Sequence, residues 1–197
     1  MTARDDILGS VRRALADADT ARVAVPDEHR RRPAPTDVVG LFAERVADYR
    51  AVVERCAPDV VAGRIAHVLA GAGRVVVPDG LAWDVPEATV DTGISALDLD
   101  GFAAVVTGAT LGIAETGTIV LTHGAGQGRR ALTLVPDLHV CIVRAGDVVP
   151  DVPAAVALLD PLLPQTWISG PSATSDIELS RVEGVHGPRT LHVIVVD

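Results

Sequence analysis

The chain has 197 residues, which is enough for one domain with a short extension and for a core that needs no disulfide or metal. Its net charge is −9, from 17 basic and 26 acidic residues, which excludes a general nucleic-acid binder, since such a protein would carry a basic surface. The sequence contains no lysine, so a Walker-type phosphate loop and Schiff-base chemistry are excluded as well.

The first 35 residues predict a helix followed by a linker. An apolar stripe at helical spacing is formed by Ile7, Leu8, Val11 and Leu15. Residues 30–35 combine three arginines with two prolines, a composition typical of a linker. We therefore expect a helical extension over residues 1–35 and an α/β domain over residues 36–197. The stripe can pack on its own domain or on a partner, and both interpretations are open.

The start of the chain is acidic and no apolar segment of signal-peptide type follows it. No apolar run later in the sequence has the length of a membrane span. We expect a cytoplasmic protein.

Helical and strand patterns alternate through the rest of the sequence. Helices are predicted at residues 37–53, 59–71, 95–102, 152–163 and 175–181. Strands are predicted at residues 74–78, 89–90, 105–106, 118–121, 132–135, 140–143, 167–168 and 191–196. Hydrophobic residues make up 48% of the chain but aromatic residues only 3%, so the core must be aliphatic. Together these patterns predict an α/β fold with a mixed, largely parallel sheet flanked by helices, and antiparallel additions in the middle.

The two cysteines are not spaced as metal ligands. Cys56 falls at an expected helix end, and Cys141 falls in an expected buried strand. Neither belongs to a Cys-x-x-Cys pair, so an iron–sulfur cluster or a structural zinc site is excluded. We expect two inert thiols, no metal site and no cofactor held by this chain alone.

Glu115 is the only charged residue between Val105 and Leu121. A carboxylate among apolar residues is costly to bury, and its environment can tune it for proton transfer. Glu115 is therefore a candidate general base, nucleophile or ligand anchor, with Thr116 and Gly117 as binding residues in the same turn. The alternative is a structural carboxylate that accepts backbone hydrogen bonds.

The segment Ala114–Thr118, followed by apolar residues, resembles the signature of LUD-domain proteins of the LutC lactate-utilisation type. Three later segments resemble the same family in the same order, and the resemblance extends over about residues 36–197. The sequence departs from the family pattern just before the signature, at residues 108–111. The three later segments are residues 131–140, 168–178 and 184–189.

The resemblance implies a fold similar to that of sugar-phosphate isomerases and CoA transferases. It also implies a non-redox subunit of a system that oxidises L-lactate to pyruvate, in which iron–sulfur and other companion subunits carry the electrons. Such a subunit would bind a small anionic metabolite or a partner's cofactor at a cleft around Glu115. The alternative is a stand-alone enzyme of CoA-transferase or cyclo-ligase type that uses Glu115 as nucleophile or base. The sequence leaves open whether the chain forms a homo-oligomer.

A glycine-rich loop precedes Arg129 and Arg130. Gly126 and Gly128 formally fit a dinucleotide fingerprint, but a strand is expected after them where that motif requires a helix. Arg129 and Arg130 are candidates to hold an anionic group. The alternative is a solvated hairpin.

A second polar segment begins at the end of an expected strand. Ser169, Gly170 and Ser172 are candidate ligand-binding residues there, and Asp176 can bond a ligand hydroxyl or favour the dipole of the helix that follows. His186 lies between glycines in a later loop and is the second candidate catalytic residue. A triad of Ser172, His186 and Asp176 is conceivable, although the nucleophile elbow is missing. We expect Glu115 to lie in a pocket, close to the Ser169–Ser172 turn or to His186.

Overall fold

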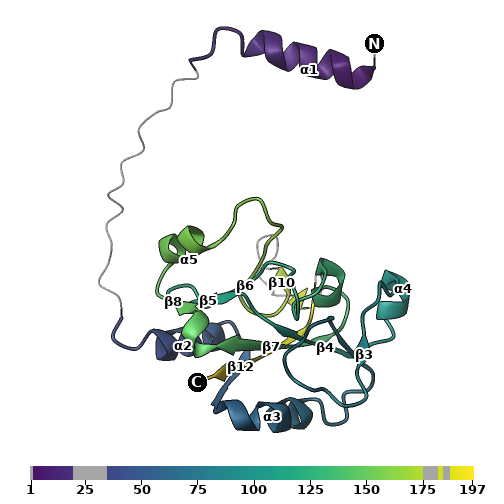
Figure 1. The fold of residues 1–197 in the computed structure, drawn as a ribbon, viewed down its shortest axis with the longest axis vertical. Helices are drawn as coiled ribbons and strands as arrows, with labels where there is room; N and C mark the ends of the chain where they lie inside the picture. Colours follow the sequence, from purple (N-terminus) through teal and green to yellow (C-terminus); the bar gives the residue numbers. More distant parts are fainter. Residues whose placement is uncertain (1, 20–34, 175–181, 184–186) are drawn as a thin grey trace. The chain divides into compact units, whose positions relative to one another are not determined.

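The computed structural model describes residues 2–19, 35–174, 182–183 and 187–197 (Figure 1). The chain divides into two compact units, residues 1–33 and residues 34–197. The first unit contains helix α1 (Ala3–Ala14), which begins with a capping box between Thr2 and Asp5. No residue of α1 is buried, and the expected apolar stripe is exposed along it. The predicted helix is thus confirmed.

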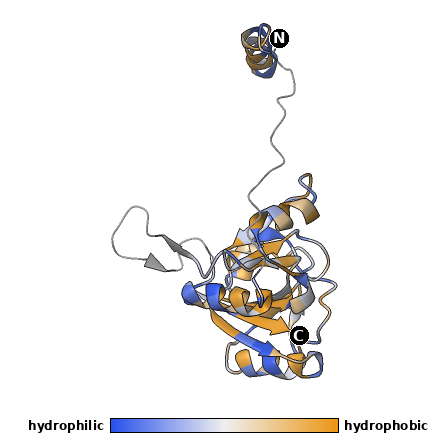
Figure 2. Cartoon of the chain, turned by 90° about the vertical axis from the view of Figure 1, so that its left-hand side faces the viewer, coloured by the Kyte–Doolittle hydropathy of each residue, from blue (hydrophilic) through white to orange (hydrophobic). Residues whose placement is uncertain are grey.

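The second unit is built on a six-stranded sheet in which every neighbouring pair is parallel. The sheet order is β1-β12-β7-β4-β2-β3. The strands are β1 (Val52–Cys56), β12 (Thr190–Val196), β7 (Leu138–Arg144), β4 (Ala104–Gly108), β2 (Val75–Val77) and β3 (Thr89–Val90). The central strands are buried on both faces, which explains their continuous runs of aliphatic residues (Figure 2).

A second, four-stranded sheet has the order β8-β5-β6-β9. Its strands are β8 (Val148–Val149), β5 (Leu111–Ile113), β6 (Thr118–Leu121) and β9 (Thr166–Ile168). The β5–β6 and β6–β9 pairs are antiparallel, which confirms the antiparallel additions predicted for the middle of the chain. After β9, strands β10 (Ala173–Thr174) and β11 (Val182–Glu183) form a two-stranded ribbon.

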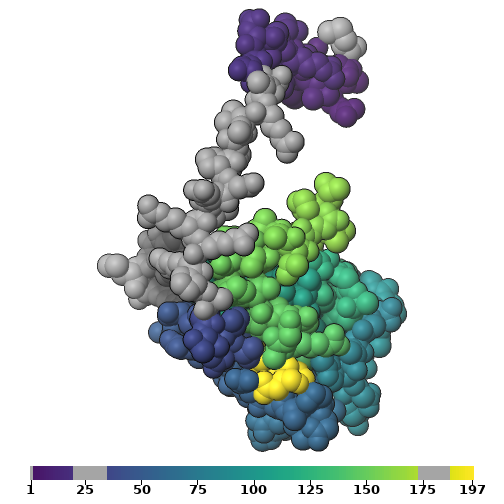
Figure 3. All heavy atoms as spheres, turned by 60° about the vertical axis from the view of Figure 1, so that its left-hand side comes forward, coloured from purple at the N-terminus to yellow at the C-terminus, as the bar shows by residue number. Residues whose placement is uncertain are grey.

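Helices α2 (Val38–Asp48) and α3 (Val61–Val68) pack on opposite faces of the large sheet. Helix α2 buries Phe42 and Val46 against the second sheet and β12, whereas α3 buries Val61 and Ile65 against the other face. The shorter helices are η1 (Pro58–Val60), α4 (Ala96–Leu99), η2 (Arg130–Thr133), η3 (Ala145–Asp147) and α5 (Val152–Leu158). In Figure 3 the C-terminal residues, in yellow, reach the surface between blue and green segments, as the place of β12 between β1 and β7 requires. Within the described residues, no helix is long and apolar enough to cross a membrane.

Two predicted helices end earlier than expected, and one predicted strand and the helix end expected at Cys56 were wrong. The predicted helix over 37–53 ends at Asp48, because Arg50 turns the chain with a φ of 66° and the residues after it pair with β12. Cys56 therefore ends a strand and not a helix. The predicted strand over 132–135 is wrong, since the chain forms η2 there and buries the successive residues Leu132 and Thr133. The predicted helix from Val152 ends at Leu158, before a proline-containing segment. The helix predicted over 175–181 lies outside the described residues.

A polar group lies inside the core. His139 on β7 is buried, and its Nε2 lies 2.8 Å from the hydroxyl oxygen of Thr107 on β4. Burial, together with the nearby charge of Arg130, lowers the pKa of His139 to about 4. Burial also raises the pKa of the Cys141 thiol to about 12, which makes this thiol inert, as predicted.

The shifted pKa of His139 predicts a loss of stability in mild acid. The folded pKa lies below the ordinary value of 6.5, so the contribution of His139 is complete above about pH 6.5 and is lost as the pH falls towards 4. The free energy of unfolding should fall by about 2 kcal/mol between about pH 7 and about pH 5. Urea titrations at several pH values measure the slope of the free energy of unfolding against pH. His139→Gln, which does not titrate, should flatten it, and an unchanged slope in that variant would assign the effect to other groups.

The two-unit organisation predicts that the front of the chain can be removed. Deleting residues 1–35 should leave the melting transition of the second unit in place and weaken association with a partner or a second copy, because an isolated helix needs a packing surface. Circular dichroism melting and sedimentation of both forms provide the test. If truncation collapses the transition while the full-length chain is a monomer, α1 packs on its own domain.

Candidate functional site

Glu115 lies in the turn between β5 and β6, and its side chain is exposed at the surface and not enclosed in a pocket as predicted. Its backbone is fixed, since the N–H of Glu115 donates to the carbonyl of Pro150 at 3.0 Å. The preceding N–H, of Ala114, donates to the carbonyl of Val149 at 2.8 Å. The turn therefore presents a carboxylate at the surface from a backbone that is hydrogen-bonded to the Val149–Pro150 segment.

A chain of hydroxyl groups connects this turn to the end of β9. The hydroxyl oxygen of Thr118 lies 2.7 Å from that of Thr116 and 2.8 Å from that of Ser169. The antiparallel pairing of β6 with β9 places Ile119 opposite Ile168, and it thereby brings Thr118 beside Ser169. Two of the segments singled out in the sequence thus meet in space.

Gly117 and Gly170 lie under the C-terminal part of α2. Both have left-handed backbone conformations, with φ values of 59° and 82°. A Cβ on Gly117 would lie 2.6 Å from the carbonyl carbon of Arg45, and one on Gly170 would lie 2.5 Å from the Cβ of Tyr49. Only glycine lets the helix come this close. The structure thus gives these two candidate ligand-binding residues a role in packing.

The third segment joins the same region through Ser172. The N–H of Ser172 donates to the carbonyl of Pro188 at 2.9 Å. A Cβ on Gly187 would lie 3.5 Å from the Cβ of Ser172 and 3.7 Å from the carbonyl oxygen of Thr133. The chain beside His186 therefore runs next to Ser172. Asp176 and His186 themselves lie outside the described residues.

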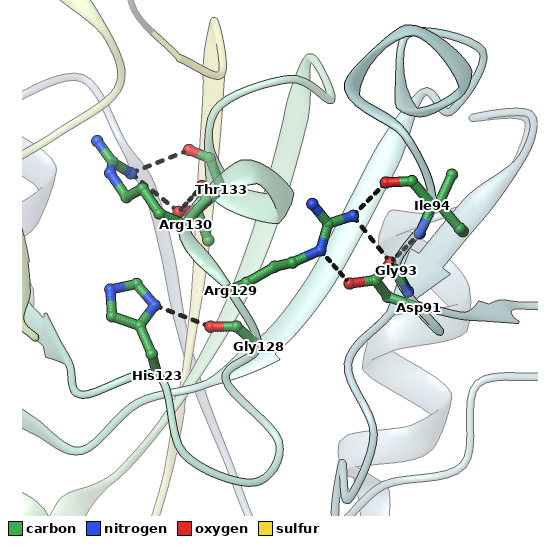
Figure 4. A network of polar contacts seen from close by, with 8 residues as sticks. All are labelled: Asp91, Gly93, Ile94, His123, Gly128, Arg129, Arg130 and Thr133. Atoms are coloured by element: carbon green, nitrogen blue, oxygen red, sulfur yellow. Dashed lines mark hydrogen bonds and ion pairs between the residues drawn. The ribbon is translucent and has the colours of Figure 1, made fainter.

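The two candidate arginines point in different directions (Figure 4). Arg129 forms an ion pair with Asp91, with its Nε 2.7 Å from a carboxylate oxygen, and also donates to the carbonyl of Ile94. The hydrogen bond from Arg129 lowers the pKa of Asp91. Arg130 instead donates to the hydroxyl of Thr133 at 2.9 Å. Arg130 thus bonds Thr133, whose carbonyl oxygen lies next to Gly187, whereas the described contacts of Arg129 are with Asp91 and Ile94.

His123 is a polar residue that the sequence did not single out. It follows β6 with a φ of 60°, a conformation that is uncommon outside glycine and that accumulates at functional or constrained sites. Its Nδ1 lies 2.8 Å from the carbonyl of Gly128 and therefore carries the proton, while its Nε2 lies 2.9 Å from the hydroxyl oxygen of Thr166. The imidazole thus ties the glycine-rich loop to β9. The signal available in the sequence was a histidine that comes two residues after the expected strand 118–121 and directly before Gly124.

Within the described part of the chain, no three His, Cys, Asp or Glu side chains come together as metal ligands. The arrangement around Glu115 is one of hydroxyl groups and a carboxylate, which suits hydrogen bonding to a small polar molecule.

The fold and this hydroxyl-lined turn define an α/β protein with a parallel six-stranded sheet and an added mixed sheet. The model of the LUD domain matches residues 28–196, and the chain belongs to the LUD domain family. It is 46% identical over 178 residues to lactate utilization protein C of Deinococcus radiodurans, which covers 83% of each chain.

Other relatives agree with this placement. The chain is 32% identical over 155 residues to lactate utilization protein C of Geobacillus kaustophilus, with 64% of each chain covered. Among solved structures, it is similar to a crystal structure described as a DUF162 family protein from Deinococcus radiodurans, with a TM-score of 0.70 and 40% identity. That match covers 81% of this chain and 96% of the other.

The glycine contacts predict how strongly α2 depends on its two turns. Gly170→Ala should lower the free energy of unfolding by about 3 kcal/mol, because the methyl group meets Tyr49 and the backbone is left-handed. Gly71→Ala is the matched control, since Gly71 has a φ of 78° and no atom within 4 Å of a Cβ. It should cost about 1 kcal/mol, from backbone strain alone. Equal losses in urea titrations would refute the close contact.

Proposed function

We propose that the chain is a non-redox subunit of a cytoplasmic system for L-lactate utilisation. Its sequence is 46% identical to a protein named lactate utilization protein C, and the match covers most of both chains. This relationship is the observation that carries the proposal, since a shared fold alone does not define a reaction.

The proposed binding site is a cleft around Glu115 that includes the Ser169–Ser172 segment and, as a candidate from the sequence alone, His186. Its ligand is a small anionic metabolite or a cofactor of a partner. L-lactate carries a hydroxyl group next to its carboxylate, so it needs both an acceptor and donors. Glu115 supplies an exposed acceptor. The two hydrogen bonds along Thr116, Thr118 and Ser169 use two of their three hydroxyl protons, so the hydroxyl at one end of this chain supplies a donor. Arg130, which lies beside the Gly187 segment through Thr133, adds a positive charge.

The electron carriers of this system would belong to companion proteins. Oxidation of L-lactate to pyruvate releases two electrons and two protons. Iron–sulfur clusters, which carry electrons one at a time, are typically held by four cysteine thiolates. This chain has only Cys56 and Cys141, and the second has a pKa raised to about 12 by burial. Iron–sulfur subunits are therefore the proposed partners.

A different reaction is suggested by the exposure of Glu115. An accessible carboxylate on a fixed turn can attack a thioester, as the glutamate nucleophile of a CoA transferase does. Incubation with acetyl-CoA, followed by mass spectrometry of the peptide that contains Glu115, tests this function. An acyl or CoA adduct on Glu115 would select the stand-alone enzyme over the subunit.

Glu115→Gln should abolish growth on L-lactate and leave the fold intact. The amide keeps the shape of the side chain but loses the negative charge and the capacity to take a proton. Growth on L-lactate is compared between cells that carry only the variant gene and cells that carry only the parent gene. The melting temperatures of the two purified proteins are compared as well. Glu87→Gln is the matched control, because Glu87 is also exposed but lies before β3. Normal growth of the Glu115→Gln strain, or a variant that melts far below the parent, would remove the functional role.

The partner proposal has its own test. The tagged full-length chain, captured from cells grown on L-lactate, should bring iron–sulfur proteins with it in fixed stoichiometry. Mass spectrometry of the captured proteins and small molecules identifies them. Capture of the chain alone, under conditions where the lactate system is active, would contradict the subunit proposal.

A further inference from the structure

The chain changes direction across the large sheet between β2 and β4. These two strands are neighbours, but the chain continues from β2 to β3 on one side, and from β4 to β7 on the other. In an open parallel sheet, the point where successive connections leave in opposite directions opens a crevice at the carboxyl ends of the strands. Such a crevice is the usual ligand position in this class of sheet.

A pocket of about 200 Å³ lies at this point. The segment Gly80–Trp83 after β2 forms one wall, and Gly108 and Ala109 at the end of β4 form another. Arg144, the last residue of β7, and Gln127 complete it. None of these residues belongs to the cleft proposed around Glu115, so this pocket is a separate site and does not depend on that proposal.

The pocket contains a guanidinium group and an aromatic ring. The guanidinium of Arg144 lies 5.7 Å from the centre of the Trp83 ring, which is a cation–π arrangement. Arg144 is exposed, and among the described residues no carboxylate pairs with it. Its planar fork of N–H groups therefore remains available for a carboxylate, which it can bind through two parallel hydrogen bonds.

Gln127 is oriented by its neighbours. Its side-chain oxygen accepts from the backbone N–H of Thr122 at 2.7 Å and from the hydroxyl of Thr110 at 3.0 Å. These two donors identify the oxygen of the amide and leave the NH₂ group for other acceptors. The described side-chain contacts of Gln127 use only that oxygen, and Gln127 lines the pocket, so its NH₂ group is the candidate for a second donor there.

The walls of the pocket are held in place before any ligand arrives. The N–H of Gly126 donates to the carbonyl of Asp79 at 2.8 Å, and the N–H of Gly108 donates to the carbonyl of Gly126 at 2.8 Å. Gly80 and Gly126 both have a φ of 73°, and a Cβ on Gly80 would lie 2.9 Å from the Cβ of Ala125. The loop is thus clamped between the ends of β2 and β4, which reduces the entropy lost on binding.

We propose that this pocket is a binding site for a small carboxylate whose acid group adjoins a flat, conjugated part. The carboxylate pairs with Arg144 and accepts from the amide of Gln127, and the flat part lies against Trp83. A single unpaired guanidinium matches the single charge of a carboxylate. The volume of about 200 Å³ restricts the ligand to a small molecule.

The test uses the full-length chain and three probes, which are pyruvate, benzoate and inorganic phosphate. Isothermal titration calorimetry should detect binding of pyruvate or benzoate, and Arg144→Gln should weaken it at least about tenfold. Arg74→Gln is the matched control, because Arg74 is also exposed and lies over an aromatic ring, that of Phe102, at 4.1 Å. The control variant should bind like the parent protein.

A second readout reports on the pocket directly. The chain has two tryptophans, so Trp167→Phe leaves Trp83 as the only indole, and benzoate should change its fluorescence. The proposal is overturned if neither carboxylate binds at concentrations up to about 10 mM. It is also overturned if Arg144→Gln binds as tightly as the parent, if the indole does not respond, or if phosphate binds more tightly than both carboxylates.

Discussion

The close contact of α2 with two glycine turns is the constraint on which the second sheet depends. Helix α2 reaches the β5–β6 turn at Gly117 and the end of β9 at Gly170, and neither position has room for a Cβ. The same helix buries Phe42 against the side of β5 where a Cβ on Gly112 would lie 2.9 Å from its ring. Because these contacts determine where the hairpin and β9 lie, they also determine the positions of Glu115 and Ser169.

A second set of contacts connects the small sheet to the carboxyl edge of the large one. His123 bonds Thr166 on β9 and the carbonyl of Gly128, and the same glycine-rich loop bonds β4 and the segment after β2 through Gly126. The loop therefore receives hydrogen bonds from both sheets. This explains how a segment with many glycines can form a defined wall of a pocket, although glycine itself favours disorder of the backbone.

The central sheet could be predicted from the sequence because buried parallel strands leave continuous aliphatic runs, as at residues 140–143 and 191–196. The turn at Glu115 was visible because a charge interrupts such a run. The 3₁₀ helix at Arg130–Thr133 was not predictable, since alternating leucines around Thr133 imitate a strand. The carboxyl-edge pocket was missed because Trp83 and Arg144 come from separate strand ends, and only the sheet order brings them together.

The described arginines differ in whether a carboxylate neutralises their charge. The chain carries a net charge of −9, so its long-range field repels anions, and an anion site must rely on short-range contacts. Many described arginines are neutralised by a carboxylate, as in the pairs formed by Arg45, Arg55, Arg64, Arg129 and Arg189. Arg144 lies against an aromatic ring at a strand end instead, and no carboxylate of the described part of the chain pairs with it. In an acidic protein without lysine, a guanidinium placed in this way at the crevice of a parallel sheet is positioned for a ligand.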